Sequence, residues 1–554
     1  MLPQDKPETA GEPRRKAVMI RRQPLRSTLT RVAALLLLIL AAGGSVVFAQ
    51  AVDADVLLTG GTVYDGTGSE GMIGDVALEG EKIVAVGQFD LGKVDRTVDC
   101  KGLIVAPGFI DLHTHSDGPI TKPKTRDNLN YLTQGCTTVV TGNCGGGPVD
   151  VGQFLKQVDQ GGAGTNVLHL VPHGAVRHQV MKDDNRPPTP GELEQMEQLV
   201  DRAMQEGAWG MSTGLIYVPG IFADTEEIIE LAKVVASHGG IYVSHIRDEG
   251  DHLLEAVEEA LQIGRQANLP VHISHFKSCG VPNWGRLGEA VALVEEARRD
   301  GVIVTADQYP YVATSTSLVD TLMRATLIPG GREKLFERMD ADPALEQAVR
   351  KVIAGRLNDT PRVVIASSKK YPQAVGKSLR EIAAEQGRDV VDLVLEIQRN
   401  GGASVVNFSL SEEDARYAMT LPWVATASDG SALFPDPETC PHPRNFGTFP
   451  RKVGYYALGQ NVLSLAQAIR SCSGLPADIL GLSDRGYLRP GAYADVVVFD
   501  PETFIDRATF ENPRQYSTGV RRLFVAGHPA LDDGKPSPTL HGRAIRHVAG
   551  TGPP

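Results

Sequence analysis

Two histidines stand two residues apart at the end of an apolar segment. The order Asp111-Leu112-His113-Thr114-His115 follows the apolar residues 103–110. Residues two apart on a strand project to the same face, so both imidazoles can enter one cavity. A lone histidine in a strand is more often a buried structural residue than a ligand. Two at this spacing at a strand end favour a metal site instead.

Three more apolar segments end in a side chain that can bind a metal or move a proton. They end in His245, His275 and Asp429, within Val-Ser-His, Ile-Ser-His and Ala-Ser-Asp-Gly. In a parallel barrel the carboxyl ends of all strands share one face, so these residues converge although they are far apart in sequence. His272 lies three residues before His275 and is expected to point to the opposite side, as a structural residue.

A cysteine completes this set of possible ligands. Cys144 lies in the glycine-rich sequence Thr-Gly-Asn-Cys-Gly-Gly-Gly, directly after an apolar segment. A thiolate binds zinc at about 2.3 Å, and zinc favours a mixture of nitrogen, sulfur and carboxylate ligands. The alternative is that Cys144 is a small buried apolar residue.

The segments that must position these residues read as strands alternating with helices. Eight apolar runs, typical of strands buried on both faces, are separated by amphipathic helical segments. The strand segments are 103–113, 137–141, 167–171, 207–212, 241–245, 271–275, 302–307 and 423–428, and the helical ones 189–205, 225–237, 253–267, 287–299 and 379–398. This pattern predicts a distorted (β/α)8 TIM barrel over residues 105–484. An open doubly wound sheet is the alternative, but no glycine-rich dinucleotide motif opens a helix.

Both chain ends have a different sequence pattern, in which short segments of alternating apolar and polar residues, typical of strands, are broken by glycines. Residues 52–104 and 485–554 are therefore expected to form one small β-sandwich domain together. Residues from about 312 to 371 interrupt the alternation of strands and helices. They are expected to form an insertion over the active site. A peripheral addition without a functional role is the alternative.

The first residues resemble an export signal. Seven basic residues between positions 14 and 31 precede an apolar run, residues 32–48, and small residues end it at Ala51, which predicts a signal peptide over 1–51. Arg21-Arg22 resembles a twin-arginine signal, so the protein is expected to be periplasmic or extracellular. An uncleaved membrane anchor is the alternative, and Met19 would give a more ordinary signal length.

Composition limits the class of partner. The formal net charge of −12, without a basic stripe after residue 50, excludes a nucleic-acid partner. Small molecules or proteins remain, and contact with a membrane is expected only through the export signal. The six cysteines are too irregularly spaced to indicate a disulfide framework.

The motifs together resemble a known family. HTHSD (113–117), GNCGGG (142–147), SHIRDEG (244–250), SHFK (274–277), DQYPY (307–311) and ASDG (427–430) are similar to those of the N-acyl-D-amino-acid deacylases, the D-aminoacylase branch of the amidohydrolase superfamily. The resemblance implies a tightly bound Zn²⁺ on Cys144, His245 and His275. It implies a second, weaker metal site at His113 and His115, with Asp429 adjacent.

The resemblance also implies a reaction, the hydrolysis of an amide bond. A zinc ion lowers the pKa of a bound water to about 7, and Asp429 is expected to take its proton and pass it to the leaving nitrogen. Asp429 as only a metal ligand or turn residue is the alternative. No lysine stands on the fourth strand, 209–213, so a lysine-bridged site of the dihydroorotase or hydantoinase kind is disfavoured and Cys144 is the expected replacement.

The substrate of such an enzyme carries a carboxylate. Lys277, Tyr309 and Ser315 are the first candidates to bind it, and Arg324 is a weaker one. Arg247 is another weak candidate, and for Arg247 and Arg324 a surface or structural ion pair is the favoured alternative. Arg444, in the loop after the eighth strand, is expected either to line the mouth of the site or to support the top of the barrel. The leading hypothesis is zinc-dependent hydrolysis of N-acyl-D-amino acids. The other two are an amidohydrolase acting on a dipeptide, cyclic amide or other N-acyl compound, and a non-catalytic binding protein with this fold.

Overall fold

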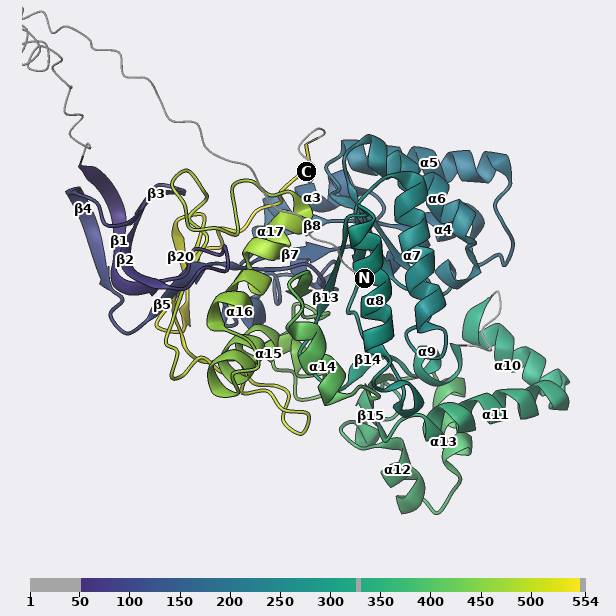
Figure 1. The fold of residues 1–554 in the computed structure, drawn as a ribbon. Helices are drawn as coiled ribbons and strands as arrows, with labels where there is room; N and C mark the ends of the chain where they lie inside the picture. The colour runs from purple at the N-terminus through teal and green to yellow at the C-terminus, as the bar shows by residue number, and fades with distance from the viewer. Residues whose placement is uncertain (1–50, 325–329, 549–554) are drawn as a thin grey trace, which may run out of the picture. The chain divides into compact units, whose positions relative to one another are not determined.

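The structure is a computed structural model that describes residues 51–324 and 330–548 (Figure 1). The predicted export signal falls almost entirely on residues 1–50, which lie outside the described residues. Within the described ranges, no helix is both long enough and apolar enough to cross a membrane.

All eight strands predicted in the middle of the chain are present and buried. Consecutive strands pair in parallel, so their carboxyl ends lie on one side of the sheet. The strands are β6 (Phe109–Asp111), β7 (Cys136–Thr141), β8 (Asn166–His169), β10 (Gly210–Gly214), β11 (Ile241–His245), β12 (Val271–Ile273), β13 (Val304–Gln308) and β17 (Val424–Thr426).

These strands form two sheets rather than the single closed ring that was expected. One sheet has the order β6-β7-β8, and the other runs β17-β13-β12-β11-β10-β9, where β9 is the short strand Val171–Pro172. Backbone hydrogen bonds span the two gaps: Trp209 N donates to His169 O at the first, and Asp429 N to His113 O and His115 N to Gly430 O at the second. At the second gap Asp429 has a φ of 48°, which turns the chain out of strand geometry and ends the ladder there.

Helices lie between successive strands on the outside of these sheets (Figure 1). Three predicted helices have the predicted bounds: α6 (Thr225–Ser237), α7 (Leu253–Ala267) and α8 (Leu287–Arg299). The others in this section are α2 (Leu129–Leu132), α3 (Val151–Gly161), α4 (His173–Met181), α5 (Pro190–Gln205), α14 (Glu412–Met419), α15 (Arg444–Pro450), the π-helix η7 (Arg451–Gly459), α16 (Leu465–Cys472) and α17 (Gly474–Leu480).

The single helix predicted over 379–398 is wrong. The structure has two helices here, α12 (Leu379–Glu385) and α13 (Val390–Arg399). Gly387 takes a φ of 62°, which ends the first helix, and the Asp389 carboxylate caps the backbone N–H groups of Val391 and Asp392 at the start of the second.

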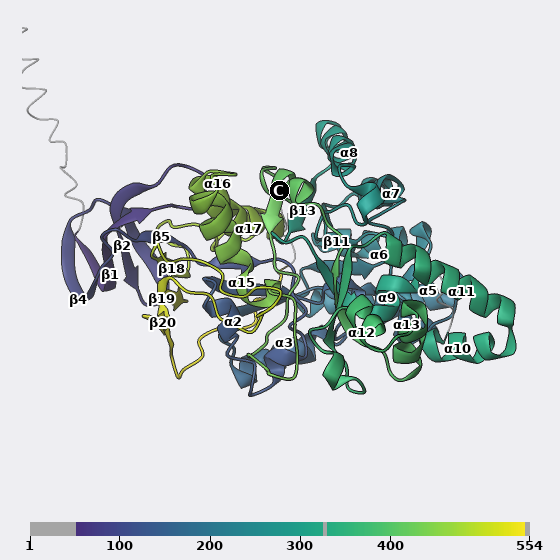
Figure 2. The same ribbon diagram turned by 90° about the horizontal axis from the view of Figure 1, so that it is seen from below.

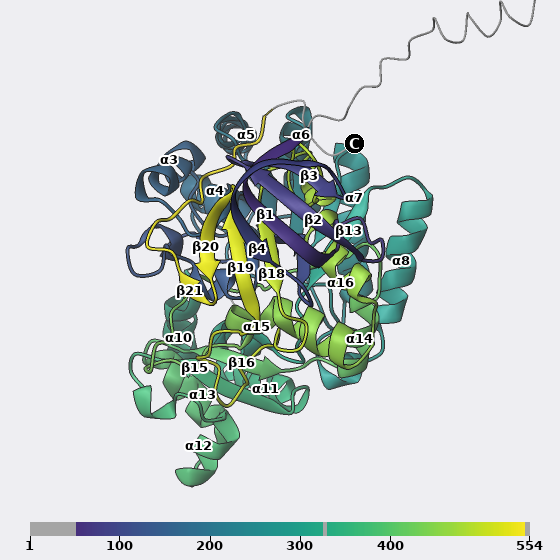
Figure 3. The ribbon, with the colours of Figure 1, turned by 90° about the vertical axis from the view of Figure 1, so that its left-hand side faces the viewer.

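Strands from both chain ends combine in one nine-stranded sheet, in which β5 pairs with β18 (Figure 3). The strands are β1 (Val52–Val63), β2 (Met72–Glu79), β3 (Lys82–Gly87), β4 (Leu91–Asp99), β5 (Ile104–Pro107), β18 (Val496–Phe499), β19 (Val520–Val525), β20 (His528–Asp532) and β21 (Lys535–Pro536). Its apolar faces include Leu58, Val76, Val498 and Phe524, all buried.

The insertion is longer than the predicted residues 312–371. Its antiparallel sheet has the order β14-β16-β15, so the central strand, β16, comes last in sequence. Its separate apolar core extends to Val405, and its helices gather in one region in Figure 2. The elements are β14 (Thr314–Ser317), α9 (Leu318–Leu322), α10 (Gly331–Ala341), α11 (Pro343–Asn358), β15 (Arg362–Ser367), α12, α13 and β16 (Ser404–Phe408).

One buried lysine opposes the stability of this fold. Lys452, on η7, is 1% exposed, and within the described residues its Nζ has no hydrogen-bond partner. Burial lowers the pKa of Lys452 from 10.5 to about 8. At pH 7 the lysine is charged in both the folded and the unfolded chain, so the folded state bears the full cost of burying the ammonium.

Replacing this ammonium by an apolar chain of similar length should therefore stabilise the protein. We expect Lys452→Met to raise the free energy of unfolding by about 1–3 kcal/mol at pH 7, seen as a higher Tm in calorimetry. The difference should shrink as the pH rises from about 8 towards 10.5, because the unfolded chain then binds more protons than the folded one. The exposed Lys101→Met is the control, and an equal effect of both variants would contradict the prediction.

Candidate metal centre and active site

Cys144, His245 and His275 meet at the carboxyl ends of three strands. The Cys144 Sγ lies 3.5 Å from His245 Nδ1 and 3.8 Å from His275 Nε2. Cys144 belongs to the short helical turn η2 (Asn143–Gly145) after β7, His245 ends β11, and His275 follows β12. From the sequence, these residues were expected to be close only because of the order of the strands. The structure shows that the ring nitrogens of His245 and His275 contact Cys144 Sγ.

His113, His115 and Asp429 form a second group beside the first. Asp429 Oδ1 lies 3.0 Å from His115 Nε2 and 3.7 Å from His113 Nε2. The two groups touch, since His113 Nε2 is 3.3 Å from Cys144 Sγ. All six residues predicted as metal ligands therefore converge.

The geometry of these donors fits a metal ion. Nitrogen and sulfur ligands of a tetrahedral zinc lie about 3.5 Å apart, which matches the distances from Cys144 Sγ to both histidines. Among the described residues, three overlapping triplets each have their donor atoms within 4.8 Å of one another. They are His113, His115 and Cys144; Cys144, His245 and His275; and His113, His275 and Asp429.

The electrostatics of the centre also favour a cation. Burial raises the pKa of the Cys144 thiol well above its usual range, so a nearby positive charge is needed to hold the thiolate. Burial lowers the pKa of His113 to about 4 and that of His245 well below its usual range. These imidazoles are therefore neutral near pH 7, which is the form that binds metals.

Two buried carboxylates that the sequence analysis did not single out orient the histidines. Glu249 Oε1 lies 2.9 Å from His275 Nδ1, so the other ring nitrogen, Nε2, faces Cys144. Asp307 Oδ2 lies 3.4 Å from His113 Nδ1, which is within ion-pair distance, although this nitrogen has no hydrogen-bond partner among the described residues. A carboxylate behind a metal-binding histidine fixes its tautomer and ring orientation.

Asp307 also holds the neighbouring strand in place. Its Oδ1 accepts a hydrogen bond from the His275 backbone N–H at 2.7 Å, and its Oδ2 lies 2.9 Å from His272 Nε2. His272 therefore faces the same oxygen as His113, so the prediction that it points to the opposite side is wrong. Its contact with Asp307 agrees with its interpretation as a structural residue. Although burial alone would raise it, the imidazoles of His113 and His272 hold the pKa of Asp307 below its usual range.

Asp429 is held in its ionised form. Arg444 NH1 lies 2.8 Å from Asp429 Oδ2, and both side chains are buried. Burial alone would raise the pKa of Asp429, but Arg444 and the hydrogen bond with His115 hold it well below its usual range. Of the two roles left open for Arg444, this contact supports one at the active site.

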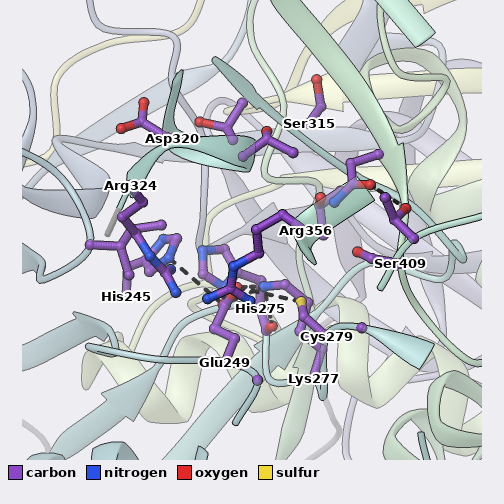
Figure 4. A pocket seen from close by; sticks show the side chains of 18 of the residues that line it. His245, Glu249, His275, Lys277, Cys279, Ser315, Asp320, Arg324, Arg356 and Ser409 are labelled. Carbon is purple, nitrogen blue, oxygen red and sulfur yellow. Dashed lines mark hydrogen bonds and ion pairs between the residues drawn. The ribbon is translucent and has the colours of Figure 1, made fainter. Parts of the chain in front are cut away.

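A cavity opens beside the metal centre, between the strand ends and the insertion (Figure 4). His245, His275 and Asp429 line it on one side, and residues of β14, α9 and the end of α11 line it on the other. The insertion thus forms one wall of the cavity rather than a peripheral addition.

Lys277 is not the free cation that the sequence analysis expected. The residue is 7% exposed, and its Nζ donates to Glu249 Oε1 at 2.5 Å and to His275 O at 2.8 Å and lies 2.7 Å from His275 Nδ1. The sequence could not show this pairing, because the two residues are 28 positions apart on neighbouring strands.

The other three predicted substrate-binding residues also line the cavity. The Tyr309 hydroxyl is buried and has no hydrogen-bond partner among the described residues, and the tyrosine ring lies between the cations of Lys277 (5.7 Å) and Arg444 (4.8 Å). The Ser315 hydroxyl donates to Val405 O at 2.9 Å. Arg324 NH2 donates to Asp248 Oδ2 at 2.8 Å, so its charge is already paired.

The missed carboxylates had a signal in the sequence. Glu249 is part of the SHIRDEG motif, four residues after His245, and Asp307 opens the DQYPY motif. In each motif the signal was an acidic residue close to a strand end that carries a histidine or adjoins one, which indicates an orienting role.

Comparison with known proteins agrees with this site. A model of the amidohydrolase family matches residues 96–307 and 335–530. D-aminoacylase of Alcaligenes xylosoxydans xylosoxydans is 37% identical over 520 residues, covering 89% of this chain and 98% of that protein. N-acyl-D-aspartate deacylase of the same organism is 36% identical over 503 residues, covering 86% of this chain and 92% of that protein.

A solved structure gives the same result in three dimensions. N-acyl-D-glutamate deacylase of Bordetella bronchiseptica, complexed with zinc and a phosphonate that mimics the tetrahedral intermediate, superposes with a TM-score of 0.77. It is 32% identical, with 89% of this chain and all of that chain (100%) covered. The chain belongs to the amidohydrolase family, within its D-aminoacylase (N-acyl-D-amino-acid deacylase) branch.

Proposed function

We propose that this protein is a zinc-dependent hydrolase that cleaves the amide bond of N-acyl-D-amino acids, releasing a carboxylate and a free D-amino acid. The observation that carries the proposal is the meeting of Cys144, His245 and His275 beside Asp429, in a cavity of a chain 37% identical to a D-aminoacylase.

Cys144, His245 and His275 would hold the tightly bound zinc, and His113 with His115 a second, weaker site next to Asp429. A bound divalent metal supplies a Lewis acid that makes water acidic enough to attack near neutral pH and polarises the acyl oxygen. Glu249 and Asp307 keep the histidine rings turned so that their free nitrogens face the centre.

Asp429 is the proton carrier of the proposed reaction. Because Arg444 and His115 keep its carboxylate ionised, Asp429 can accept a proton as the attacking water loses it. Its Oδ2 faces Arg444, which leaves Oδ1, on the side of the histidines, as the oxygen that takes the proton. Returning this proton to the amide nitrogen turns the amine into a viable leaving group.

The substrate's α-carboxylate is placed near Tyr309 and Ser315. The Tyr309 hydroxyl has no hydrogen-bond partner among the described residues and can donate to an anion. Lys277 and Arg444 lie 5.7 Å and 4.8 Å from its ring, but each is paired with a carboxylate, so the hydroxyl is the donor on which this placement rests.

Two other hypotheses remain for comparison by experiment. An amidohydrolase acting on a dipeptide or a cyclic amide would use the same centre with a different cavity wall. A non-catalytic binding protein would not need Asp429 to be held ionised beside the metal ligands, which is the observation that favours an enzyme.

The finer features of the fold and the location of the protein are also proposals. We infer that the two inner sheets together form a distorted (β/α)8 barrel, and that the nine-stranded sheet folds over as a small β-sandwich domain. The composition of residues 1–51 supports export to the periplasm or the cell exterior, with an uncleaved anchor as the alternative.

Export predicts a defined mature protein. When the full chain is expressed in a bacterial host, we expect the protein recovered outside the cytoplasm to begin at Val52, as found by N-terminal mass spectrometry. Replacement of Arg21 and Arg22 by lysine should retain it in the cytoplasm if the twin-arginine route is used. A mature chain that still begins at Met1 and sits in the membrane fraction would favour the anchor.

The substrate proposal predicts turnover of one enantiomer. Purified protein with about one tightly bound zinc per chain should hydrolyse N-acetyl-D-amino acids, while the L enantiomers react at least about 100-fold more slowly, since about 2.7 kcal/mol of transition-state binding accounts for that ratio. Zinc content by mass spectrometry and release of free amine are measured on the same preparation. Exclusive turnover of L substrates would refute the proposal.

The proton-carrier role predicts the effect of one substitution. Asp429→Asn keeps the size of the side chain but cannot accept a proton, so kcat should fall by about 100-fold or more. Retained zinc in the same sample would show that the tight site does not need this carboxylate. Asp436→Asn, at an acidic residue of the loop after β17 that is absent from the cavity lining, serves as the control. Unchanged kcat in Asp429→Asn would remove Asp429 from the mechanism.

A further inference from the structure

The cations around the active site differ in whether a carboxylate neutralises them. Three have an acidic partner within 2.8 Å: Lys277 with Glu249 at 2.5 Å, Arg324 with Asp248 at 2.8 Å and Arg444 with Asp429 at 2.8 Å. Arg356 also lines the cavity, but no ion pair or hydrogen bond of its guanidinium group is present within the described residues. Its positive charge is therefore available to a ligand.

Arg356 enters the cavity from the insertion. It lies in the last turn of α11 and points into the cavity in Figure 4. The chain just after it is fixed, because Thr360 Oγ1 donates to Asn407 Oδ1 at 2.5 Å and to Phe408 O at 3.0 Å. Asp359 lines the same wall, but no ion pair joins it to Arg356 in the part of the chain that the structure describes.

A guanidinium in this position suits a carboxylate. Arginine binds carboxylates through two parallel N–H···O hydrogen bonds, and this pairing gains strength in a cavity that is partly closed to water. The α-carboxylate of the proposed substrate already has a place near Tyr309 and Ser315. The charge of Arg356 on the α11 wall is therefore left for a second anionic group.

We propose, on the basis of the proposed function, that Arg356 determines side-chain specificity by binding a carboxylate on the amino-acid side chain. The preferred substrates are then N-acyl-D-amino acids with an acidic side chain, of the aspartate or glutamate class. Arg324 stays paired with Asp248, which neutralises its charge, so Arg324 is not the partner of this carboxylate.

The test compares acidic and apolar substrates in matched variants. For the zinc-loaded wild-type enzyme, kcat/KM should be higher with N-acetyl-D-glutamate or N-acetyl-D-aspartate than with N-acetyl-D-leucine. Arg356→Gln should lower the ratio of acidic to leucine kcat/KM by about 10- to 100-fold, mainly through a higher KM, because a charged hydrogen-bond pair is lost. Arg356→Lys should restore part of the ratio.

The control lies on the same helix. Arg350 pairs with Glu346 at 2.9 Å and Asp392 at 2.7 Å and does not line the cavity, so Arg350→Gln should leave the ratio as in the wild type. Thermal melting and zinc content show whether each variant is folded and loaded.

The outcomes are distinct. A wild-type preference for leucine, or an Arg356→Gln variant with the wild-type ratio, would overturn the role of Arg356 while leaving the deacylase function intact. If the wild type cleaves none of the N-acetyl-D substrates, the proposed function itself fails, and the inference with it.

Discussion

The metal centre depends on the chain turning inward where its strands end. Cys144, His275 and Asp429 take φ angles of 53°, 36° and 48°, in the left-handed region that residues with a side chain seldom adopt. Each such residue costs on the order of 1 kcal/mol or more, which the surrounding structure must offset. Backbone hydrogen bonds at the turns supply part of this: Asp429 N donates to His113 O, and Phe276 N donates to Asp307 O. Strain is concentrated where donor atoms have to meet.

The same turns tie the buried charges into a single network. Glu249 Oε1 faces His275 Nδ1 at 2.9 Å and Lys277 Nζ at 2.5 Å, and it lies 3.8 Å from His245 Nε2. Glu249 therefore faces His275 directly and Lys277 neutralises its carboxylate, whereas His245 Nε2 has no hydrogen-bond partner among the described residues. Although burial alone would raise it, Lys277 and the two histidines hold the pKa of Glu249 well below its usual range. The lysine found on the sixth strand thus supports the metal site indirectly.

Sequence patterns predicted the features of the structure that depend on residues close together in the chain. The bounds of α6, α7 and α8 follow from a strong apolar periodicity together with clear ends, such as the Asp224 carboxylate that caps α6. The convergence of the six candidate metal ligands was predictable because parallel strands bring their carboxyl ends to one face. The pairing of Lys277 with Glu249 and the central place of β16 in the insertion were not, since both depend on contacts between distant segments. The break at Gly387 was missed because the apolar spacing continues across it.

The division between metal centre and insertion explains how one fold can serve several substrates. The ligands and their orienting carboxylates all lie on or next to the inner strands, whereas the opposite cavity wall belongs to a segment with its own apolar core. A change in that wall, such as a cation gained or lost at the end of α11, need not disturb the histidines or Cys144. Relatives named D-aminoacylase, N-acyl-D-aspartate deacylase and N-acyl-D-glutamate deacylase can then share the centre and differ across the cavity. Under the proposed role of Arg356, substrate selection belongs to the cavity wall formed by the insertion, and the reaction belongs to the strand ends.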